Sequence, residues 1–456
     1  MLLRILKNKG YIWLPGYLKS RQYHRKIRYP KNRDVHLIFL VVDHFEPSRT
    51  QGLMGIRNVR EWCKKYEKIA KLHNDSDGRY PQHTWFYRYD YPSYECINIL
   101  NEYVFKGLGE IEFHLHHSYD TSESFTKNIF EGVSWFNQAG AMISAESIPH
   151  KRFGYIAGNW ALDNGRRNPA YSGVNNELKI LNNAGCYADF TFPAIGTNAQ
   201  PRKVNSIYYA TDTAKPKSYN KGTNVAVNGT PSGDLMIFQG PLYVDWKHKY
   251  TESAALESFA PYRARRIDNW IRAGIHVAGR PEWIFVKLHT HGMQSRDVFF
   301  GDQLNNMLTD LENRFKKSPY HLHYVTAREA YNIVKAAEAG EQGDPEAFRD
   351  FSIPKPINNE IFCNYPYTLE EFSDHHIIVN IKSVSTDTVI IFKNLPLRSI
   401  KGGKITRVEI TYAADFVKRL SVNGTGTTCF KGTSVITSAN YMKTVSLPFS
   451  TSKLLS

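Results

Sequence analysis

Residues 36–42, His-Leu-Ile-Phe-Leu-Val-Val, run directly into Asp43-His44-Phe45-Glu46-Pro47, and this junction decides the fold. An almost unbroken apolar run of this length is typical of a strand that is buried on both faces of a parallel sheet. Polar and charged side chains begin where the strand ends. In a βα barrel that end carries the active site, so Asp43 and His44 are candidates for a catalytic base and a metal ligand. The simpler alternative is that Asp43 only caps the loop that follows.

The same pattern recurs along residues 35–337, where β-branched or aromatic runs alternate with segments of helical period. This alternation is typical of βα units around a parallel sheet, and seven or eight such units favour a barrel. We predict strands over residues 35–43, 83–87, 109–116, 153–157, 186–191, 234–238, 282–289 and 320–325. We predict helices over residues 57–74, 93–106, 121–138, 172–184, 255–274, 302–317 and 326–338.

Two further segments bear on the domain organisation. Residues 198–233, rich in Gly, Asn, Thr, Lys and Pro, are predicted to form a long functional or mobile loop. Residues 339–345, Ala-Gly-Glu-Gln-Gly-Asp-Pro, indicate a boundary, beyond which strand-like runs without a convincing helix favour a small antiparallel β domain. We therefore predict a basic N-terminal arm at 1–34, an α/β barrel at 35–345 and a C-terminal β-rich domain at 346–456.

The formal net charge of +15 is concentrated in residues 1–34, where ten Lys or Arg stand against one acid, Asp34. Interleaved Leu, Tyr and Trp side chains suit either a peripheral position on an anionic membrane surface or an arm packed on the barrel. We discount nucleic acid as a partner, because no recognisable binding module lies behind the arm.

The sequence also carries signals of location. No apolar run approaches the roughly 20 residues that cross a bilayer, and the N-terminus has no signal-peptide pattern. Five scattered cysteines, odd in number, fit reduced thiols better than a disulfide framework. We expect a cytoplasmic protein, with attachment to the inner face of a membrane as the alternative.

Residues 109–120, Gly-Glu-Ile-Glu-Phe-His-Leu-His-His-Ser-Tyr-Asp, are the most informative segment. Period-two alternation places Glu112, His114 and His116 on one face of a strand. His117 and Asp120 follow just past the strand end and can complete a ligand set for a divalent transition metal, because neutral imidazole and carboxylate suit zinc and its neighbours. Three histidines in four positions, flanked by acids, argue against a purely structural role.

The late strand at residues 283–292, Trp-Ile-Phe-Val-Lys-Leu-His-Thr-His-Gly, repeats this arrangement. Lys287, His289 and His291 share one face of the strand. A histidine beside a metal can act as the general acid that protonates a leaving group, because its pKa lies near neutral pH. One of the two histidines is expected only to hydrogen-bond a neighbouring loop.

Aromatic residues stand beside amides and acids in the middle of the chain, at residues 158–164, 187–193 and 243–246. Trp and Tyr next to Asn and Asp make a surface suited to sugar rings, which have apolar faces edged by hydroxyl groups. Asn159, Trp160, Asp163 and Trp246 are therefore candidates for substrate binding. For any single Trp, ordinary core packing is the better explanation.

The order of these motifs, Asp-His-Phe-Glu-Pro from Asp43, His-Leu-His-His from His114, Asn-Trp-Ala-Leu-Asp-Asn from Asn159 and Lys-Leu-His-Thr-His-Gly from Lys287, resembles the polysaccharide-deacetylase-like (NodB-homology) superfamily. The likeness covers about residues 35–337 and looks closest to a poorly characterised branch. It implies an irregular (β/α)7 barrel, one divalent metal (zinc, with cobalt, nickel or manganese as alternatives) and hydrolysis of N- or O-acetyl groups on polysaccharides.

The resemblance also implies roles for individual residues: Asp43 as base, His44, His116 and Asp120 as metal ligands, His114 as an alternative ligand, and His289 as acid. The chain departs from the family pattern in three motifs. Asp43-His44 replaces Asp-Asp, His116 followed by Asp120 replaces His-x-x-x-His, and Asn159-Trp160 stands where an Arg-bearing motif is usual.

We therefore expect a metal-dependent carbohydrate hydrolase that deacetylates N- or O-acetylated sugars of a surface polysaccharide or its precursor, with His289 or His291 as the acid. Two alternatives remain open. One is a non-catalytic glycan-binding or assembly protein on the same barrel. The other is a glycoside hydrolase that uses paired carboxylates, for which Asp43, Glu46, Glu112 and Asp163 are available.

Overall fold

The computed structural model describes residues 1–27, 34–47, 53–142, 153–296, 300–317 and 319–356, together with seven separate strands between Tyr367 and Pro448. The chain divides into two compact units. The first consists of Met1–Pro92, Leu108–Phe130 and His150–Pro354. The second consists of Ser93–Gly107, Glu131–Pro149 and Lys355–Ser456.

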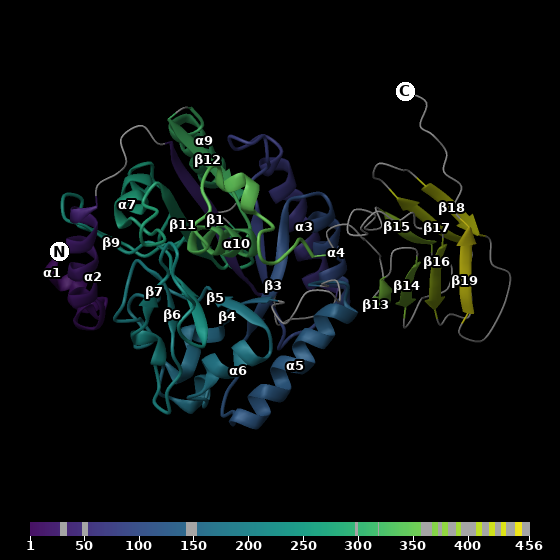
Figure 1. Ribbon diagram of the computed structural model, residues 1–456, viewed down its shortest axis with the longest axis horizontal. Helices are drawn as coiled ribbons and strands as arrows, with labels where there is room; N and C mark the ends of the chain where they lie inside the picture. Colours follow the sequence, from purple (N-terminus) through teal and green to yellow (C-terminus); the bar gives the residue numbers. More distant parts are fainter. Residues whose placement is uncertain are drawn as a thin grey trace. The chain divides into compact units, whose positions relative to one another are not determined.

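A ten-stranded, mostly parallel sheet forms the centre of the first unit (Figure 1). Its strands are β1 (Val35–Phe45), β2 (His83–Arg88), β3 (Gly109–Leu115), β4 (Phe153–Ala157), β5 (Cys186–Asp189), β6 (Ile207–Ala210), β7 (Thr223–Asn224), β8 (Leu235–Phe238), β11 (Trp283–Thr290) and β12 (Tyr320–Tyr324). They follow the order β11-β1-β2-β3-β4-β5-β8-β6-β7, and β12 pairs with the start of β1.

This sheet confirms the predicted α/β class and all eight strands predicted between residues 35 and 325. Barrel closure is a separate matter: among the described strands no ladder joins β8 to β11, where a closed barrel would be completed. The (β/α)7 barrel therefore stays a prediction.

Helices lie at or near all the predicted positions. They are α3 (Leu53–Ala70), α4 (Tyr94–Phe105), α5 (Ser122–Gln138), α6 (Glu177–Asn183), α7 (Arg265–Ala273), α9 (Asp302–Phe315) and α10 (Ala327–Glu338). Only the second half of the predicted 255–274 helix is helical. It ends at Gly274, whose φ of 67° is the left-handed conformation that commonly terminates helices.

The predicted loop at 198–233 contains regular structure. β6 pairs antiparallel with β8, β7 pairs antiparallel with β6, and a short 3-10 helix, η4 (Ser218–Asn220), lies between β6 and β7. All four residues of β6 are buried, so its apolar side chains stabilise a strand despite the turn-forming residues on either side. The prediction of a continuous loop was therefore wrong for the residues of β6, η4 and β7.

β1 is covered on both faces, as its apolar sequence predicts. On one face Ile38, Leu40 and Val42 join the main core, which includes residues of α10. On the other face the Phe39 ring lies 6.2 Å from that of Trp270, and the Phe45 ring lies 5.4 Å from that of Trp62, measured between ring centroids.

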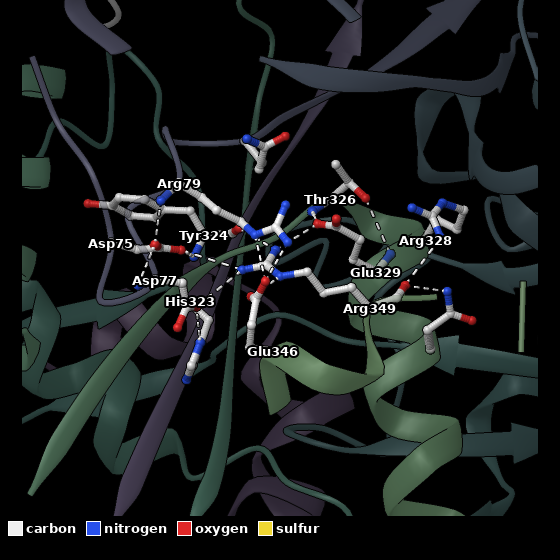
Figure 2. A network of polar contacts seen from close by, with 12 residues as sticks. Asp75, Asp77, Arg79, His323, Tyr324, Thr326, Arg328, Glu329, Glu346 and Arg349 are labelled. Atoms are coloured by element: carbon white, nitrogen blue, oxygen red, sulfur yellow. Dashed lines mark hydrogen bonds and ion pairs between the residues drawn. The ribbon is translucent and has the colours of Figure 1, made fainter. Parts of the chain in front are cut away.

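The start of α10 lies against the amino-terminal ends of β2 and β3. The amide of Ala327 donates to Thr84 Oγ1 at 3.0 Å, and Arg328 Nη2 lies 2.8 Å from Glu110 Oε1. Figure 2 shows how Arg328 and Arg349 extend this contact into a network of ion pairs. This network fixes the end of the sheet opposite to the histidine motifs.

The first unit continues past the predicted boundary at residue 345 as far as Pro354. The carbonyls of Arg349 and Ile353 accept hydrogen bonds from the Asn332 amide, at 2.6 and 2.7 Å, and Ile353 is buried in the main core. Long-range bonds therefore keep this segment in the first unit despite the Gly- and Pro-containing stretch before it.

The basic N-terminal arm forms two helices, α1 (Leu2–Lys7) and α2 (Gly10–Lys26), which lie beside β9 (Tyr243–Asp245) (Figure 1). Trp13 and Tyr17 are buried in a cluster with Leu242 and Val244. The arm thus packs aromatic side chains on the rest of the unit, one of the two predicted options. Several of its leucines nevertheless remain exposed.

The second unit contains the C-terminal strands, β13 (Tyr367–Phe372), β14 (His376–Ile381), β15 (Val389–Lys393), β16 (Arg407–Tyr412), β17 (Arg419–Gly424), β18 (Phe430–Ser434) and β19 (Lys443–Pro448). They form two sheets, β13-β14-β16-β19 and β15-β17-β18. β14 pairs parallel with β16, and β15 with β17, so the expected purely antiparallel domain is instead mixed. Each parallel pair is separated in sequence by a strand of the other sheet, which supplies the crossover that parallel pairing requires.

Candidate metal centre

The histidines of β1, β3 and β11 meet at the carboxyl ends of these parallel strands. Val42 of β1 pairs with His289 of β11, and Arg88 of β2 pairs with His114 of β3. Residues that pair in this way lie on the same face of the sheet. The ring centroid of His44 lies 5.1 Å from that of His114 and 4.5 Å from that of His291. The predicted clustering of histidines from distant strands is therefore present.

A carboxylate from the end of β1 joins the histidines. Glu46 Oε1 lies 3.2 Å from His114 Nε2 and 3.0 Å from His116 Nε2, and the two imidazole nitrogens lie 3.0 Å apart. Glu46 also belongs to a second group with His44 and His291, whose potential ligand atoms lie within 4.8 Å of one another. Glu46 therefore connects two sets of three residues, each of which could hold a metal ion.

The donor atoms of these groups fit a divalent metal. His114 Nδ1 lies 2.9 Å from the carbonyl of Ile156, a contact in which Nδ1 donates and Nε2 keeps its lone pair. His44 Nε2 is buried and has no hydrogen-bond partner among the described residues. Tetrahedral ligands at zinc distances lie about 3.3 Å apart, close to the spacing of the Glu46, His114 and His116 donors.

A guanidinium and an amide hold the other oxygen of Glu46. Arg88 Nη1 lies 3.4 Å from Glu46 Oε2, and Gln294 Nε2 donates to the same oxygen at 3.1 Å. Burial alone would raise the pKa of Glu46, but the hydrogen bonds with His114 and His116 outweigh it and lower the pKa. Glu46 is therefore an anion under ordinary conditions, as a metal ligand must be.

The two histidines of β11 differ in their surroundings. His291 Nδ1 lies 2.7 Å from Glu257 Oε1, and although burial lowers its pKa, this bond raises the pKa above the usual value. In the described part of the chain, no carboxylate pairs with His289. Burial, followed by the charge of Lys287, lowers its pKa well below the usual range. Of the two, His291 is the one that can carry a proton near neutral pH.

A pocket of about 580 Å³ opens beside the cluster, and its lining residues are Glu46, Pro47, Arg88, His116, Asn159, Met293, Gln294 and Arg296. Trp160 borders the cluster, with its ring centroid 5.8 Å from that of His44 and 5.7 Å from that of His291. Gly158 is required here, because a Cβ at this position would lie 2.6 Å from the His116 ring. The Gly-Asn-Trp segment thus adjoins the candidate metal centre.

Asp43 is set apart from this cluster. Asp43 and His44 are consecutive residues of β1, where they pair with Trp85 and Phe86. Because side chains alternate along a strand, Asp43 faces the side of the sheet opposite to His44. Its Oδ2 lies 2.9 Å from His83 Nε2, and its Oδ1 accepts the Gly292 amide at 2.7 Å. A Cβ on Gly292 would lie 2.2 Å from Oδ2, which explains the glycine that follows His291. Both oxygens of the predicted base are thus engaged by His83 and the Gly292 amide, on the face of the sheet away from His44.

Asp120 also lies outside the two groups. Its Oδ2 lies 2.9 Å from His117 Nδ1, and its Oδ1 accepts from Ser124 Oγ at 2.7 Å. Burial lowers the pKa of His117, but the bonds to Asp120 and Glu177 outweigh it and raise that pKa to about 9. The structure therefore assigns Asp120 to an ion pair with His117, and Glu46 replaces it as the carboxylate beside the histidines.

The other two proposed sugar-binding residues lie in different surroundings. Asp163 is fully buried and its Oδ2 accepts the Ser218 amide at 2.6 Å. Trp246 is 57% exposed and lies in the turn between β9 and β10 (Tyr250–Glu252), a hairpin that packs on the N-terminal helices. Neither lines the pocket beside the cluster.

The residues that the sequence interpretation missed are Glu46, Arg88 and Glu257. Glu46 belongs to the first motif, but the sequence suggested it only as one of the paired carboxylates of a glycoside hydrolase. A signal was present, because Glu46 lies two positions after His44 and period two puts both on one face. Arg88 and Glu257 had no motif of their own, and only the fold brings them to this site.

Comparison with known proteins adds nothing to this geometry. No family model matches the chain, and no curated protein matches it significantly. No helix in the described part of the chain is long and apolar enough to cross a membrane.

Proposed function

We propose that this protein is a metal-dependent carbohydrate hydrolase that removes N- or O-acetyl groups from the sugars of a surface polysaccharide or its precursor. The observation that supports it best is the meeting of Glu46, His114 and His116 at the carboxyl ends of parallel strands, beside a pocket. Ligands of this kind suit zinc, and cobalt, nickel or manganese are alternatives.

In this proposal Glu46, His114 and His116 hold the metal, with His44 as a further ligand. The hydrogen bond from His114 Nδ1 to the Ile156 carbonyl orients the imidazole. A bound divalent metal would lower the pKa of a water molecule toward about 7 and polarise the acetyl carbonyl. Arg88 steadies Glu46 from the side away from the histidines.

His291 serves as the general acid. Glu257 orients its imidazole through Nδ1, and His291 belongs to the same group of potential ligands as His44 and Glu46. Trp160 and Asn159 provide the aromatic and amide contacts expected for a sugar ring. Asp43 is a positioning residue in this scheme, because it holds the Gly292 amide next to His291 and does not face the pocket.

The glycoside-hydrolase alternative has less support. It requires two carboxylates on either side of a glycosidic bond. Of the four candidates only Glu46 lines the pocket. Asp43 is engaged by His83, and Glu112 is fully buried beneath the site, where it accepts the Tyr187 hydroxyl and the Gly154 amide.

The test is the metal content of the purified protein, by elemental analysis after incubation with zinc, together with acetate release from chitin oligosaccharides and an O-acetylated polysaccharide. We expect about one metal per chain in the wild type, its loss in His116→Ala, and its retention in the matched control His248→Ala, which changes a partly exposed histidine on the β9–β10 turn. His291→Gln should keep the metal and lose acetate release.

The outcomes separate the alternatives. Metal binding with new reducing ends and no acetate would favour glycosidic cleavage. A wild-type protein without metal that still binds glycan would favour the non-catalytic binder. Equal metal content in the wild type and in His116→Ala would remove the proposed centre altogether.

A further inference from the structure

The first unit contains a second, larger cavity that the metal centre does not use. It is a groove of about 1080 Å³ between α2 and residues 198–224. Its basic lining side chains are Lys19, Arg167, Arg202, Lys203, Lys217 and Lys221. Among the residues that the structure describes, no Asp or Glu lines it. We call this cavity the basic groove.

These six cations lack acidic partners: within the part of the chain that the structure describes, none of them forms an ion pair with an Asp or Glu. The side chain of Lys217 is largely buried, and its Nζ donates to the carbonyls of Asn198 and Gln200, the latter at 3.1 Å. Burial, followed by the charges of Arg167 and Arg202, lowers the pKa of Lys217 to about 8. Gathering like charges in one cavity is unfavourable unless an anion offsets them.

The groove is held in a fixed shape by close packing of α2. Gly16 lies so near the Arg202 carbonyl that a Cβ on it would come within 1.8 Å of that oxygen. Trp13 and Tyr17 anchor the same helix in a buried cluster with Val204. The two walls are therefore tied together by the packing of α2, and a fixed shape reduces the cost of ordering the site on binding.

One end of the basic groove carries aromatic rings. The ring of Tyr23 stacks on that of His276 with centroids 5.9 Å apart, and His24 lies 5.5 Å from His276. Burial and the neighbouring His276 lower the pKa of His24 to about 4, so its ring is neutral near pH 7. A flat or apolar group attached to the anion could pack against these rings.

We propose that the basic groove binds a phosphate-bearing ligand, with its phosphate or diphosphate among Arg202, Lys203 and Lys217 and its organic group toward Tyr23 and His276. Lys and Arg are the side chains that bind phosphate oxygens most strongly, and a cavity of this size suits a whole nucleoside diphosphate or the head of a lipid phosphate. The proposal goes beyond the proposed hydrolase function and does not depend on it, since the groove shares no lining residue with the pocket at the histidines.

Isothermal titration calorimetry of the full chain tests the proposal with three probes: inorganic pyrophosphate, uridine diphosphate, and monomeric dihexanoyl phosphatidic acid below its micelle concentration. The variant is Arg202→Gln/Lys221→Gln, because both side chains are exposed and the protein should still fold. The control is Lys215→Gln, an exposed lysine of the same segment that does not line the groove.

We expect at least one probe to bind, with Kd raised about tenfold or more in the double variant, since the Arg202 contact and the further positive charge of Lys221 are lost, and within about twofold of wild type in the control. Tighter binding of uridine diphosphate than of pyrophosphate would identify a nucleotide, and preference for the lipid would identify a membrane-derived phosphate. Absence of binding by all three probes, or equal weakening by the variant and the control, would overturn the proposal.

Discussion

At residue scale, Asp43 and His44 are neighbours in one strand with opposite surroundings. His44 faces the histidine cluster, whereas Asp43 faces His83. The sequence predicts that both residues stand at the end of a buried strand, and alternation predicts that they face opposite ways. It does not reveal which face carries the pocket, because that depends on strands far away in the chain. For this reason the histidines could be predicted, whereas alternation alone, which places Glu46 on the face of His44, could not decide between Glu46 and Asp43.

A substitution at Asp43 tests its positioning role. In Asp43→Asn the buried hydrogen bond with His83 is disturbed, so we expect the free energy of unfolding to fall by about 1–3 kcal/mol. Metal content should remain that of the wild type, because the carboxylate does not face Glu46, His114 or His116. Denaturant unfolding and elemental analysis measure the two effects. Loss of the metal at unchanged stability would mean that Asp43 is a ligand after all.

Asp163 should make stability depend on pH. Burial, followed by repulsion from Asp212 and Glu177, raises its pKa to about 8, although hydrogen bonds from Ser218 oppose the shift. An unfolded aspartate has a pKa of about 3.9, so between pH 4 and 8 the folded protein holds a proton that the unfolded chain has lost. The contribution of Asp163 to the free energy of unfolding is therefore fully present below about pH 4 and is lost as the pH rises to about 8.

Asp163→Asn should remove this dependence. Urea unfolding at pH 5, 6, 7 and 8 should show a slope shallower than that of the wild type by up to about 1.4 kcal/mol per pH unit. The amide oxygen can still accept the Ser218 amide, so the fold should be retained. Parallel stability curves for the two proteins would show that Asp163 is not protonated in the folded state.

At the scale of elements, strands were easier to predict than the N-terminal helices. Strands such as β1 and β11 are long apolar runs with turn signals on either side. α2 contains Pro15 and Gly16, which disfavour an isolated helix. It forms because Trp13 and Tyr17 gain burial against Leu242, a long-range contact that local sequence does not show. β6 was missed for the same reason, since its pairing with β8 stabilises a strand within a segment rich in turn residues.

Arg349 connects several elements through one buried guanidinium (Figure 2). Its Nη1 lies 2.9 Å from Glu329 Oε2 of α10 and donates to the Tyr324 carbonyl of β12 at 2.8 Å, while Nη2 lies 3.4 Å from Asp75 Oδ2. In Arg349→Met the carboxylates of Glu329 and Asp75 lose this buried positive charge. We expect a loss of about 3–5 kcal/mol in the free energy of unfolding.

The matched control is Arg314→Met, which removes the exposed ion pair with Asp268. Exposed pairs contribute about 1 kcal/mol or less. Thermal and urea unfolding of the two variants compare them directly, and a loss in Arg349→Met no larger than in the control would show that the buried network is not needed for stability.

At the scale of the whole molecule, composition predicts that the chain changes character near residue 345 but not where the first unit ends. The segment up to Pro354 stays with the first unit because Asn332 and Arg328 bind its carbonyls. The mixed parallel and antiparallel pairing of the C-terminal strands could likewise not be predicted from the sequence. β14 and β16 look alike as isolated strands, and their parallel direction depends on β15 lying in the other sheet.

The exposed apolar side chains of α1 and α2 lead to the last prediction. Leu2, Leu3, Leu6 and Leu18 are 68%, 76%, 62% and 59% exposed, while Ile5, Trp13 and Tyr17 of the same helices are buried. The helices also carry most of the basic residues of the arm. Exposed leucines next to positive charge are the pattern of a peripheral membrane contact, in which apolar burial and attraction to anionic lipid add together.

We therefore expect the protein to float with vesicles that contain anionic phospholipid, and to float less with neutral vesicles or at high salt. Leu2→Ser/Leu3→Ser/Leu6→Ser should weaken vesicle partitioning at least about tenfold, because each leucine loses on the order of 1 kcal/mol of burial. The control Leu72→Ser alters an equally exposed leucine after α3 and should leave partitioning unchanged. Equal flotation of the triple variant and the wild type would instead leave these leucines without a membrane role, and the arm would then act only through its packing on the first unit.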